Sequence, residues 1–191
     1  MNFKELKELN LSYNHVLSDI KVLEKVKFEK LEKLDLSGNK ILNINILEKV
    51  NFKELKKLYL YGNNISDINV LEKVKFEKLE KLNLGWNQIS NINILEYVNF
   101  KELKELYFYE NNISDINVLE NVKFEKLEIL NLGKNNISDI KVLEKIKFEK
   151  LEYLGLNNNK ISDINILEKV NFKELKELNL NGNQSFKIYF F

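Results

Sequence analysis

The chain consists of tandem copies of one short unit, and this feature limits its fold more than any other. Phenylalanine recurs at positions 3, 28, 52, 76, 100, 124, 148 and 172, at intervals of 24 residues after a first interval of 25. Each Phe begins the pattern Phe-x-x-Leu-x-x-Leu-x-Leu-x-x-Asn, and Phe108 is the one replacement at a leucine position. A unit this short cannot bury its apolar side alone. The eight copies therefore predict a solenoid in which neighbouring turns cover each other.

The two halves of the unit predict different local structures. Leu-x-Leu alternation has the period of a strand with one buried side, so stacked copies should form a parallel sheet with strands about 4.8 Å apart. In the second half, for example residues 69–74, Leu71 and Val74 have the spacing of a short helical turn. Asn69 and Glu72 are spaced like an N-cap residue and its reciprocal partner.

The repeated pattern Leu-x-x-Leu-x-Leu-x-x-Asn resembles the leucine-rich repeat family over essentially the whole chain. The Asn-x-Ile-Ser-Asp-Ile that follows is most similar to the phosphatase-regulator and internalin classes, here with an unusual 24-residue unit. The resemblance implies an α/β fold: a right-handed, horseshoe-shaped solenoid with a parallel β-sheet on the concave face and short helical turns on the convex face. We expect eight repeats over residues 1–183 and a divergent aromatic tail over residues 184–191.

One asparagine stands at the same place in every unit, and we interpret this column as structural. Buried amide side chains can satisfy backbone groups of adjacent turns at each step. The expected ladder consists of Asn14, Asn39, Asn63, Asn87, Asn111, Asn135, Asn159 and Asn183.

Charged residues around each Phe alternate between Asn-Phe-Lys-Glu-Leu-Lys and Lys-Phe-Glu-Lys-Leu-Glu from one unit to the next. The order breaks between Phe124 and Phe148, where two units of the second type adjoin. We expect lysines of one turn to lie beside glutamates of the next, each pair adding about 0 to 1 kcal/mol.

Composition argues against several classes of function. With 30 basic and 29 acidic side chains, the net charge of +1 does not favour nucleic acid as a partner. No apolar run approaches 18 residues and no leader pattern opens the chain, so we expect no membrane insertion and favour a cytoplasmic location, although the compartment stays open.

The chain also lacks the usual residue sets of catalysis. Cysteine is absent, and no nucleophile–base–acid set can be assembled around His15, the single histidine. The repeated Ser-Asp pairs fit turns better than a calcium row. We therefore predict neither enzymatic activity nor a bound metal or cofactor.

Positions that vary between near-identical units point to binding. Residues flanking the inward leucines face the concave side of the sheet, and aromatics gather there in repeats three to five: Tyr59, Tyr61, Trp86, Tyr107 and Tyr109. A column of Lys33, Lys57 and Lys81 borders them, followed by Ile129 and Tyr153. Because Tyr and Trp are enriched in interface hot spots, these residues predict a protein-binding surface, and the lysines favour an acidic partner. The alternative is that cross-strand aromatic pairs only stabilise the sheet.

The two ends support a second hypothesis, a structural or self-assembling solenoid. No polar cap precedes the first repeat, and residues 184–191 leave the repeat pattern and become aromatic. The tail then folds over the last turn, or pairs between molecules as part of a homo-oligomer, or belongs to a longer repeat protein. The sequence does not choose among these readings.

Overall fold

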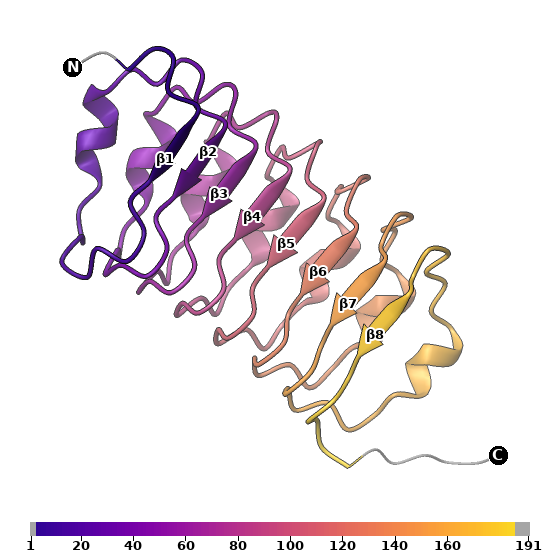
Figure 1. Cartoon of the computed structure of the whole chain (residues 1–191). Coiled ribbons are helices and arrows are strands. Elements are labelled where there is room, and N and C mark those ends of the chain that lie inside the picture. The colour runs from indigo at the N-terminus through magenta and orange to yellow at the C-terminus, as the bar shows by residue number, and fades with distance from the viewer. Residues whose placement is uncertain (1–2, 186–191) are drawn as a thin grey trace.

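The computed structural model describes residues 3–185 and confirms the stacked solenoid (Figure 1). Each repeat contributes one short strand, and the eight strands pair in sequence order, all parallel, in a single sheet. The register advances by one whole unit per strand, so that Leu34 lies opposite Leu58, and Leu58 opposite Leu82. The strands are β1 (Glu8–Asn10), β2 (Lys33–Asp35), β3 (Lys57–Tyr59), β4 (Lys81–Asn83), β5 (Glu105–Tyr107), β6 (Ile129–Asn131), β7 (Tyr153–Gly155) and β8 (Glu177–Asn179).

Short 3₁₀ helices form the convex layer behind the sheet (Figure 1). They are η1 (Lys21–Lys25), η2 (Asn45–Glu48), η3 (Asn69–Glu72), η4 (Asn93–Glu96), η5 (Asn117–Glu120), η6 (Lys141–Glu144) and η7 (Asn165–Glu168).

The prediction that Asn69 caps its helical turn is wrong. Asn69 is the first residue of η3. The N-cap position belongs to the preceding Ile68, whose side chain makes no capping hydrogen bond. The cap comes from Asp67, whose Oδ1 accepts the Asn69 N–H at 2.9 Å. Asp115 and Asp163 make the same bond at η5 and η7. The Asp of each Ser-Asp pair thus bonds a nearby backbone amide, as the turn interpretation predicts.

The core is a continuous stack between the sheet and the 3₁₀ layer. Its inward leucines, among them Leu58, Leu82 and Leu106, have no exposed surface. Phe108, which replaces a leucine of the pattern, is equally buried and takes the same place in the stack. A row of phenylalanine rings runs along one side, with centroids 6.0 Å apart for Phe28 and Phe52. Burying each unit against its neighbours is what makes the solenoid stable.

The asparagine ladder is confirmed at atomic detail. Nδ2 of Asn111 donates to the carbonyl of Leu84 in the preceding turn and to that of Phe108 in its own turn, both at 3.0 Å. Its Oδ1 accepts the N–H of Ile89 at 2.9 Å. The carbonyls are shared along the ladder, since that of Leu84 also accepts from Asn87 and that of Phe108 also accepts from Asn135.

The first two members of the ladder differ from the others. Asn14 is exposed, and among the described residues it donates only to carbonyls of its own turn. Asn39 is buried, but its Oδ1 has no partner. The N–H that would reach it belongs to Leu17, and the extra residue of the first repeat lets that group donate to the backbone carbonyl of Asn14 instead. The insertion at His15 therefore costs the ladder one bond.

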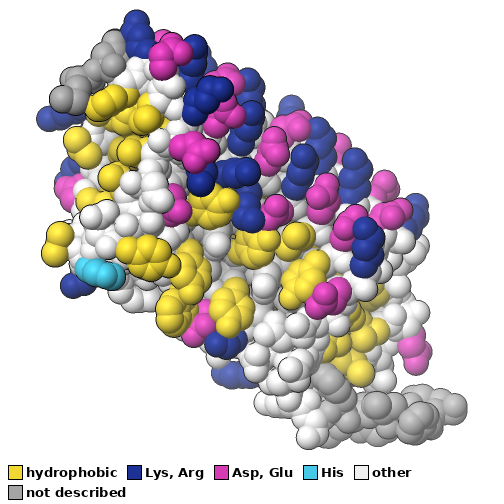
Figure 2. All heavy atoms as spheres, in the orientation of Figure 1, with side chains coloured by type: hydrophobic (Ala, Val, Ile, Leu, Met, Phe, Trp, Pro, Cys, Tyr) yellow, Lys and Arg dark blue, Asp and Glu magenta, His cyan; other side chains and the backbone are white. Residues whose placement is uncertain are grey.

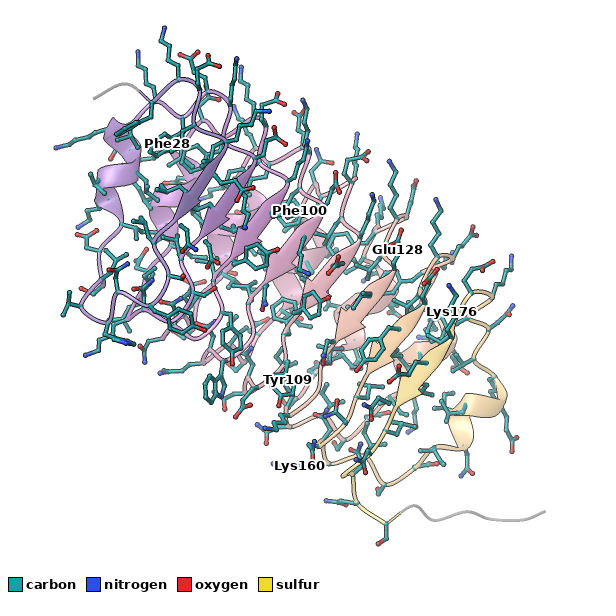
Figure 3. The ribbon with its side chains drawn as sticks, in the orientation of Figure 1. Phe28, Phe100, Tyr109, Glu128, Lys160 and Lys176 are labelled. Atoms are coloured by element: carbon teal, nitrogen blue, oxygen red, sulfur yellow. The ribbon has the colours of Figure 1, made fainter. Side chains whose placement is uncertain are left out.

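Lysine–glutamate pairs join neighbouring turns along the side of the sheet where the strands begin, which we call its N-terminal edge. The alternating units predict these pairs. Examples are Lys56–Glu32 at 2.7 Å and Lys126–Glu102 at 2.6 Å. The pattern breaks where the two like units adjoin: Glu128 and Glu152 occupy equivalent places in adjacent turns, and Glu152 pairs onward with Lys176 at 2.8 Å. Figure 3 labels Glu128 and Lys176 along this edge.

Candidate functional site

The concave face divides into a polar edge and an apolar region. Figure 2 shows acidic and basic side chains alternating along one side of the molecule, with hydrophobic side chains gathered across the strands beside them. Tyr109 lies at the edge of the sheet opposite that of Glu128 and Lys176 (Figure 3). The aromatic residues named from the sequence fall into two groups, one on the strands and one at their C-terminal edge.

The first group surrounds Lys81 on β4. Tyr59 and Tyr107 flank it, with the ammonium 5.9 Å and 5.0 Å from their ring centroids. The same ammonium bonds Glu105, which also accepts the Tyr107 hydroxyl at 2.7 Å. Burial, and then the bond to Glu105, raise the pKa of Tyr107, so its hydroxyl stays protonated. Burial raises the pKa of Glu105, but hydrogen bonds from Lys81 and Tyr107 outweigh it, and the pKa ends below its usual value.

The second group lies where the strands end. The rings of Tyr61 and Trp86 are stacked, with centroids 5.8 Å apart. Gly85 lies close beneath this group. A Cβ at Gly85 would approach the Tyr61 ring to 3.2 Å and the Tyr109 carbonyl to 3.1 Å. Tyr109 in turn lies beneath the Lys134 ammonium, 5.2 Å from its ring centroid.

Trp86 lies at a position whose backbone is left-handed in every repeat. Its φ is +53°, and the equivalent residues are glycine in three repeats (Gly38, Gly62, Gly182) and non-glycine in four others (Tyr13, Glu110, Lys134, Asn158). A residue with a Cβ costs about 1–2 kcal/mol there, so this strain belongs to the repeat and is not peculiar to Trp86. What distinguishes Trp86 is its large aromatic side chain, since the residue is 52% exposed.

Tyr13 joins this group, although the sequence places it three repeats before Trp86. Its ring covers Gly38, where an added Cβ would lie 2.4 Å from a ring carbon. After burial, the nearby Tyr13 hydroxyl is the largest cause of the raised pKa of Tyr61. The signal in the sequence is the pair of glycines, Gly38 and Gly62, because they leave no side chains between the rings. We call Tyr13, Tyr61, Trp86 and Tyr109 the rim cluster.

The lysine column is confirmed as a row of direct neighbours across β2, β3 and β4, but its three members differ in charge pairing. Lys33 bonds Glu8 at 3.2 Å, and Lys81 bonds Glu105. Lys57 is exposed and forms no ion pair with any residue between 3 and 185.

Ile129 and Tyr153 lie opposite each other on β6 and β7, beyond Glu105 in the same row. The Tyr153 ring lies over Gly155 of its own strand, 3.0 Å from where a Cβ would stand. They extend the apolar surface past β5.

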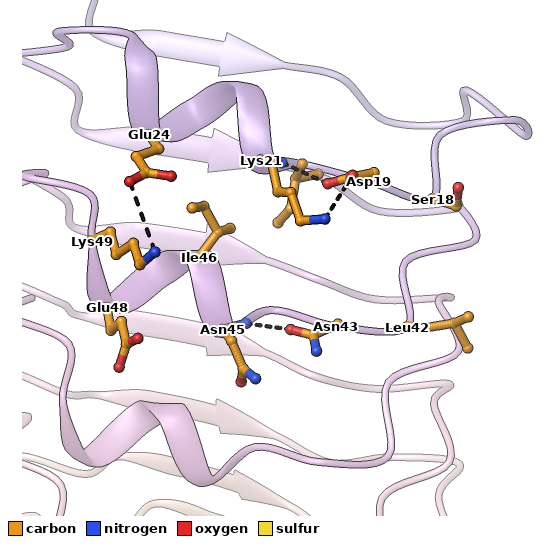
Figure 4. A pocket seen from close by; sticks show the side chains of 11 residues that line it. Ser18, Asp19, Lys21, Glu24, Leu42, Asn43, Asn45, Ile46, Glu48 and Lys49 are labelled. Atoms are coloured by element: carbon orange, nitrogen blue, oxygen red, sulfur yellow. Dashed lines mark hydrogen bonds and ion pairs between the residues drawn. The ribbon is translucent and has the colours of Figure 1, made fainter.

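The convex face has shallow hollows between successive 3₁₀ helices, of which the one between η1 and η2 is shown in Figure 4. Its charged groups face one another: Lys49 pairs with Glu24 at 3.8 Å, and Lys21 with Asp19 at 3.5 Å. Within residues 3–185, no three carboxylate or imidazole groups converge as metal ligands. In the same range, no helix is long and apolar enough to cross a bilayer.

Comparison with known proteins identifies the family. Models described as leucine-rich repeats in two copies match residues 53–97, 101–145 and 149–188, and a single leucine-rich repeat matches residues 30–49. The chain therefore belongs to the leucine-rich repeat family. A search of curated proteins finds no significant match.

Solved structures place it near the internalins. An internalin (inlF) from Listeria monocytogenes is 31% identical with a TM-score of 0.78, over 95% of this chain and 49% of the other. Internalin C2 (inlC2) of the same species is 30% identical with a TM-score of 0.76, over 93% and 72%. A leucine-rich repeat protein of Leptospira interrogans is 26% identical with a TM-score of 0.68, over 95% and 50%. The chain thus spans about half the length of two of these three proteins.

Proposed function

We propose that this protein is a non-enzymatic recognition module that binds a partner protein through the concave face of β3 to β5. Leucine-rich repeat domains commonly act as protein interaction modules, and their solenoids present extended concave surfaces. The observation that carries the proposal is Trp86: a large, half-exposed aromatic side chain stacked on Tyr61 beside the tyrosines of β3 and β5.

The surroundings of Trp86 fit a binding centre. Stacking on Tyr61 limits the freedom of the ring, so little side-chain entropy is lost when a partner docks. The closed network of Tyr59, Lys81, Glu105 and Tyr107 beside it offers a pre-organised, partly apolar surface. A plant peptide hormone receptor that shares only the fold, at 22% identity, was solved in complex with its peptide RGF2.

Changing Tyr59, Tyr61, Trp86 and Tyr107 to Ser should abolish capture of the partner without unfolding the chain, because the asparagine ladder and the leucine core stay intact. The measurement is quantitative affinity capture with wild type and variant, paired with thermal melting by circular dichroism. Tyr97→Ser is the matched control, since Tyr97 is 65% exposed but follows η4 on the convex face. A partner that is retained by the four-site variant, or lost equally by the control, contradicts the proposal.

A second candidate function, self-association, is favoured by the exposed core residues of the first repeat. Val22 is 60% exposed, whereas the equivalent Ile46 of the second repeat is 8% exposed. Phe3 is 43% exposed and Phe28 only 5%. The aromatic tail invoked beside them lies outside the described residues from position 186 on.

Light scattering over a concentration series tests this candidate. Self-association predicts a species heavier than the 22.7 kDa chain, which Val22→Lys should return to a monomer because a charge then faces the docking surface. Leu42→Lys, at a residue 63% exposed in the second repeat, should leave the mass unchanged. A monomer at every concentration rejects the candidate.

A further inference from the structure

Lys57 holds the unpaired positive charge of the lysine column. Its neighbours lean away from it: the Lys33 ammonium bonds Glu8 on β1, and the Lys81 ammonium bonds Glu105 on β5. Both bonds are directed away from β3, which leaves the space above Lys57 bordered by two ammonium groups that are already paired.

One more acidic residue, Asp35, lies near the lysine column, on the β2 side of Lys57. Asp35 is two residues after Lys33 on β2, where its charge helps to raise the pKa of Lys33 after the larger effects of Glu8. One of its oxygens accepts the Ser37 N–H at 3.0 Å. The free positive charge therefore lies over β3, next to the aromatic residues.

Lys57 and Tyr61 lie on one extended segment of the chain, which begins with β3 and continues past its end. Backbone hydrogen bonds to the neighbouring turn continue past the end of β3, from Leu60 N–H to Asn83 and from Gly62 N–H to Gly85. The four-residue separation therefore stays extended, and the two side chains share the concave face at a distance of roughly 13 Å. The half-buried Tyr59 lies between them.

We infer that the concave face selects a partner segment with a carboxylate against Lys57 and, roughly 13 Å further along, an apolar or aromatic side chain against Tyr61 and Trp86. This inference rests on the proposed function. A carboxylate suits the site because it brings one negative charge to one unpaired ammonium, whereas a phosphate group carries about −1.5 to −2. The spacing adds a geometric requirement to charge complementarity, which by itself mainly sets the rate of association.

Selection of random peptides about fifteen residues long, displayed on phage, against the immobilised full chain tests this without a known partner. Enriched peptides should share an acidic residue and an aromatic one at a spacing that spans roughly 13 Å, which is four residues in an extended peptide and about nine in a helical one. The best peptide, synthesised, should bind Lys57→Gln about tenfold more weakly than wild type. Lys123→Gln, at an exposed lysine on another face, is the control and should not change binding.

A double-mutant cycle makes the assignment specific. If the peptide's carboxylate meets Lys57, changing that acid to its amide should also cost about tenfold, and in Lys57→Gln the same change should cost nothing more. Independent, additive losses overturn the inference, as do enriched peptides without a shared acid. Failure of the proposed function looks different, because the peptides would then bind the four-site Ser variant as well as wild type.

Discussion

Replacing Trp86 with glycine should weaken partner binding by about 2 kcal/mol or more, roughly thirtyfold, while the free energy of unfolding stays within about 1 kcal/mol of wild type. The two effects separate because of the backbone. Glycine relieves about 1–2 kcal/mol of left-handed strain at φ +53°. Against this stand the loss of the stack on Tyr61, about 0.5–1.5 kcal/mol, and the greater entropy of glycine in the unfolded chain, about 0.5–1 kcal/mol. These terms nearly cancel for folding, whereas binding loses its central contact.

The matched control is Asn158→Gly. Asn158 has the same φ of +53° and the same place in its repeat, but it lies in repeat seven, away from the rim cluster. This variant should bind the partner like wild type. Binding is measured by titration calorimetry with the captured partner and stability by urea unfolding. A Trp86→Gly chain that keeps full affinity would move the binding centre away from the rim.

Asn111→Ala should lower the free energy of unfolding by about 1–3 kcal/mol, because it leaves the buried N–H of Ile89 without its partner. The carbonyls of Leu84 and Phe108 each lose one bond as well, but they still accept from Asn87 and Asn135. Water that enters the gap recovers part of this free energy. In a solenoid the damage lies at one interface between turns, so the unfolding transition should also become less cooperative.

Asn112→Ala provides the comparison. Asn112 is exposed, and only its backbone N–H is bonded, to the Ile89 carbonyl, which alanine preserves. We expect a change below about 0.5 kcal/mol. Urea unfolding followed by circular dichroism measures both variants, and equal stabilities would show that the ladder contributes little.

The similarity to the internalins concerns the repeat domain. At about 30% identity over nearly the whole chain it supports a common architecture, while the covered part is only 49% of the inlF chain. Which partner this chain meets depends on side chains of the concave face that differ from repeat to repeat, and these are the residues that the proposed experiments change.

Predictions drawn from repetition succeeded, and predictions that needed the path of a particular loop did not. The strand, the inward leucines and the asparagine ladder recur in every unit, so each is determined by a pattern seen eight times. The cap of η3 was assigned to Asn69 from spacing alone, but the loop places Asp67 two residues before the first helical amide. The orphaned Oδ1 of Asn39 arises from one extra residue in the first repeat, and its consequence appears only when the turns are stacked.

For the candidate site, the sequence by itself determined which residues face outward on the sheet, because strand alternation and a fixed repeat length leave no choice of face or register. It therefore placed the lysine column on three neighbouring strands and Tyr59 and Tyr107 on β3 and β5, while Tyr61, Trp86 and Tyr109 lie just past the strand ends. The tertiary structure decided which of them lie together: Tyr13 reaches the rim over bare glycines, Lys81 pairs with Glu105 between two tyrosines, and Lys57 is left without an ion pair among the described residues. Side-chain direction across a sheet is set by local packing and charge, and these depend on neighbours that lie about 24 residues away in sequence but only about 4.8 Å away in space.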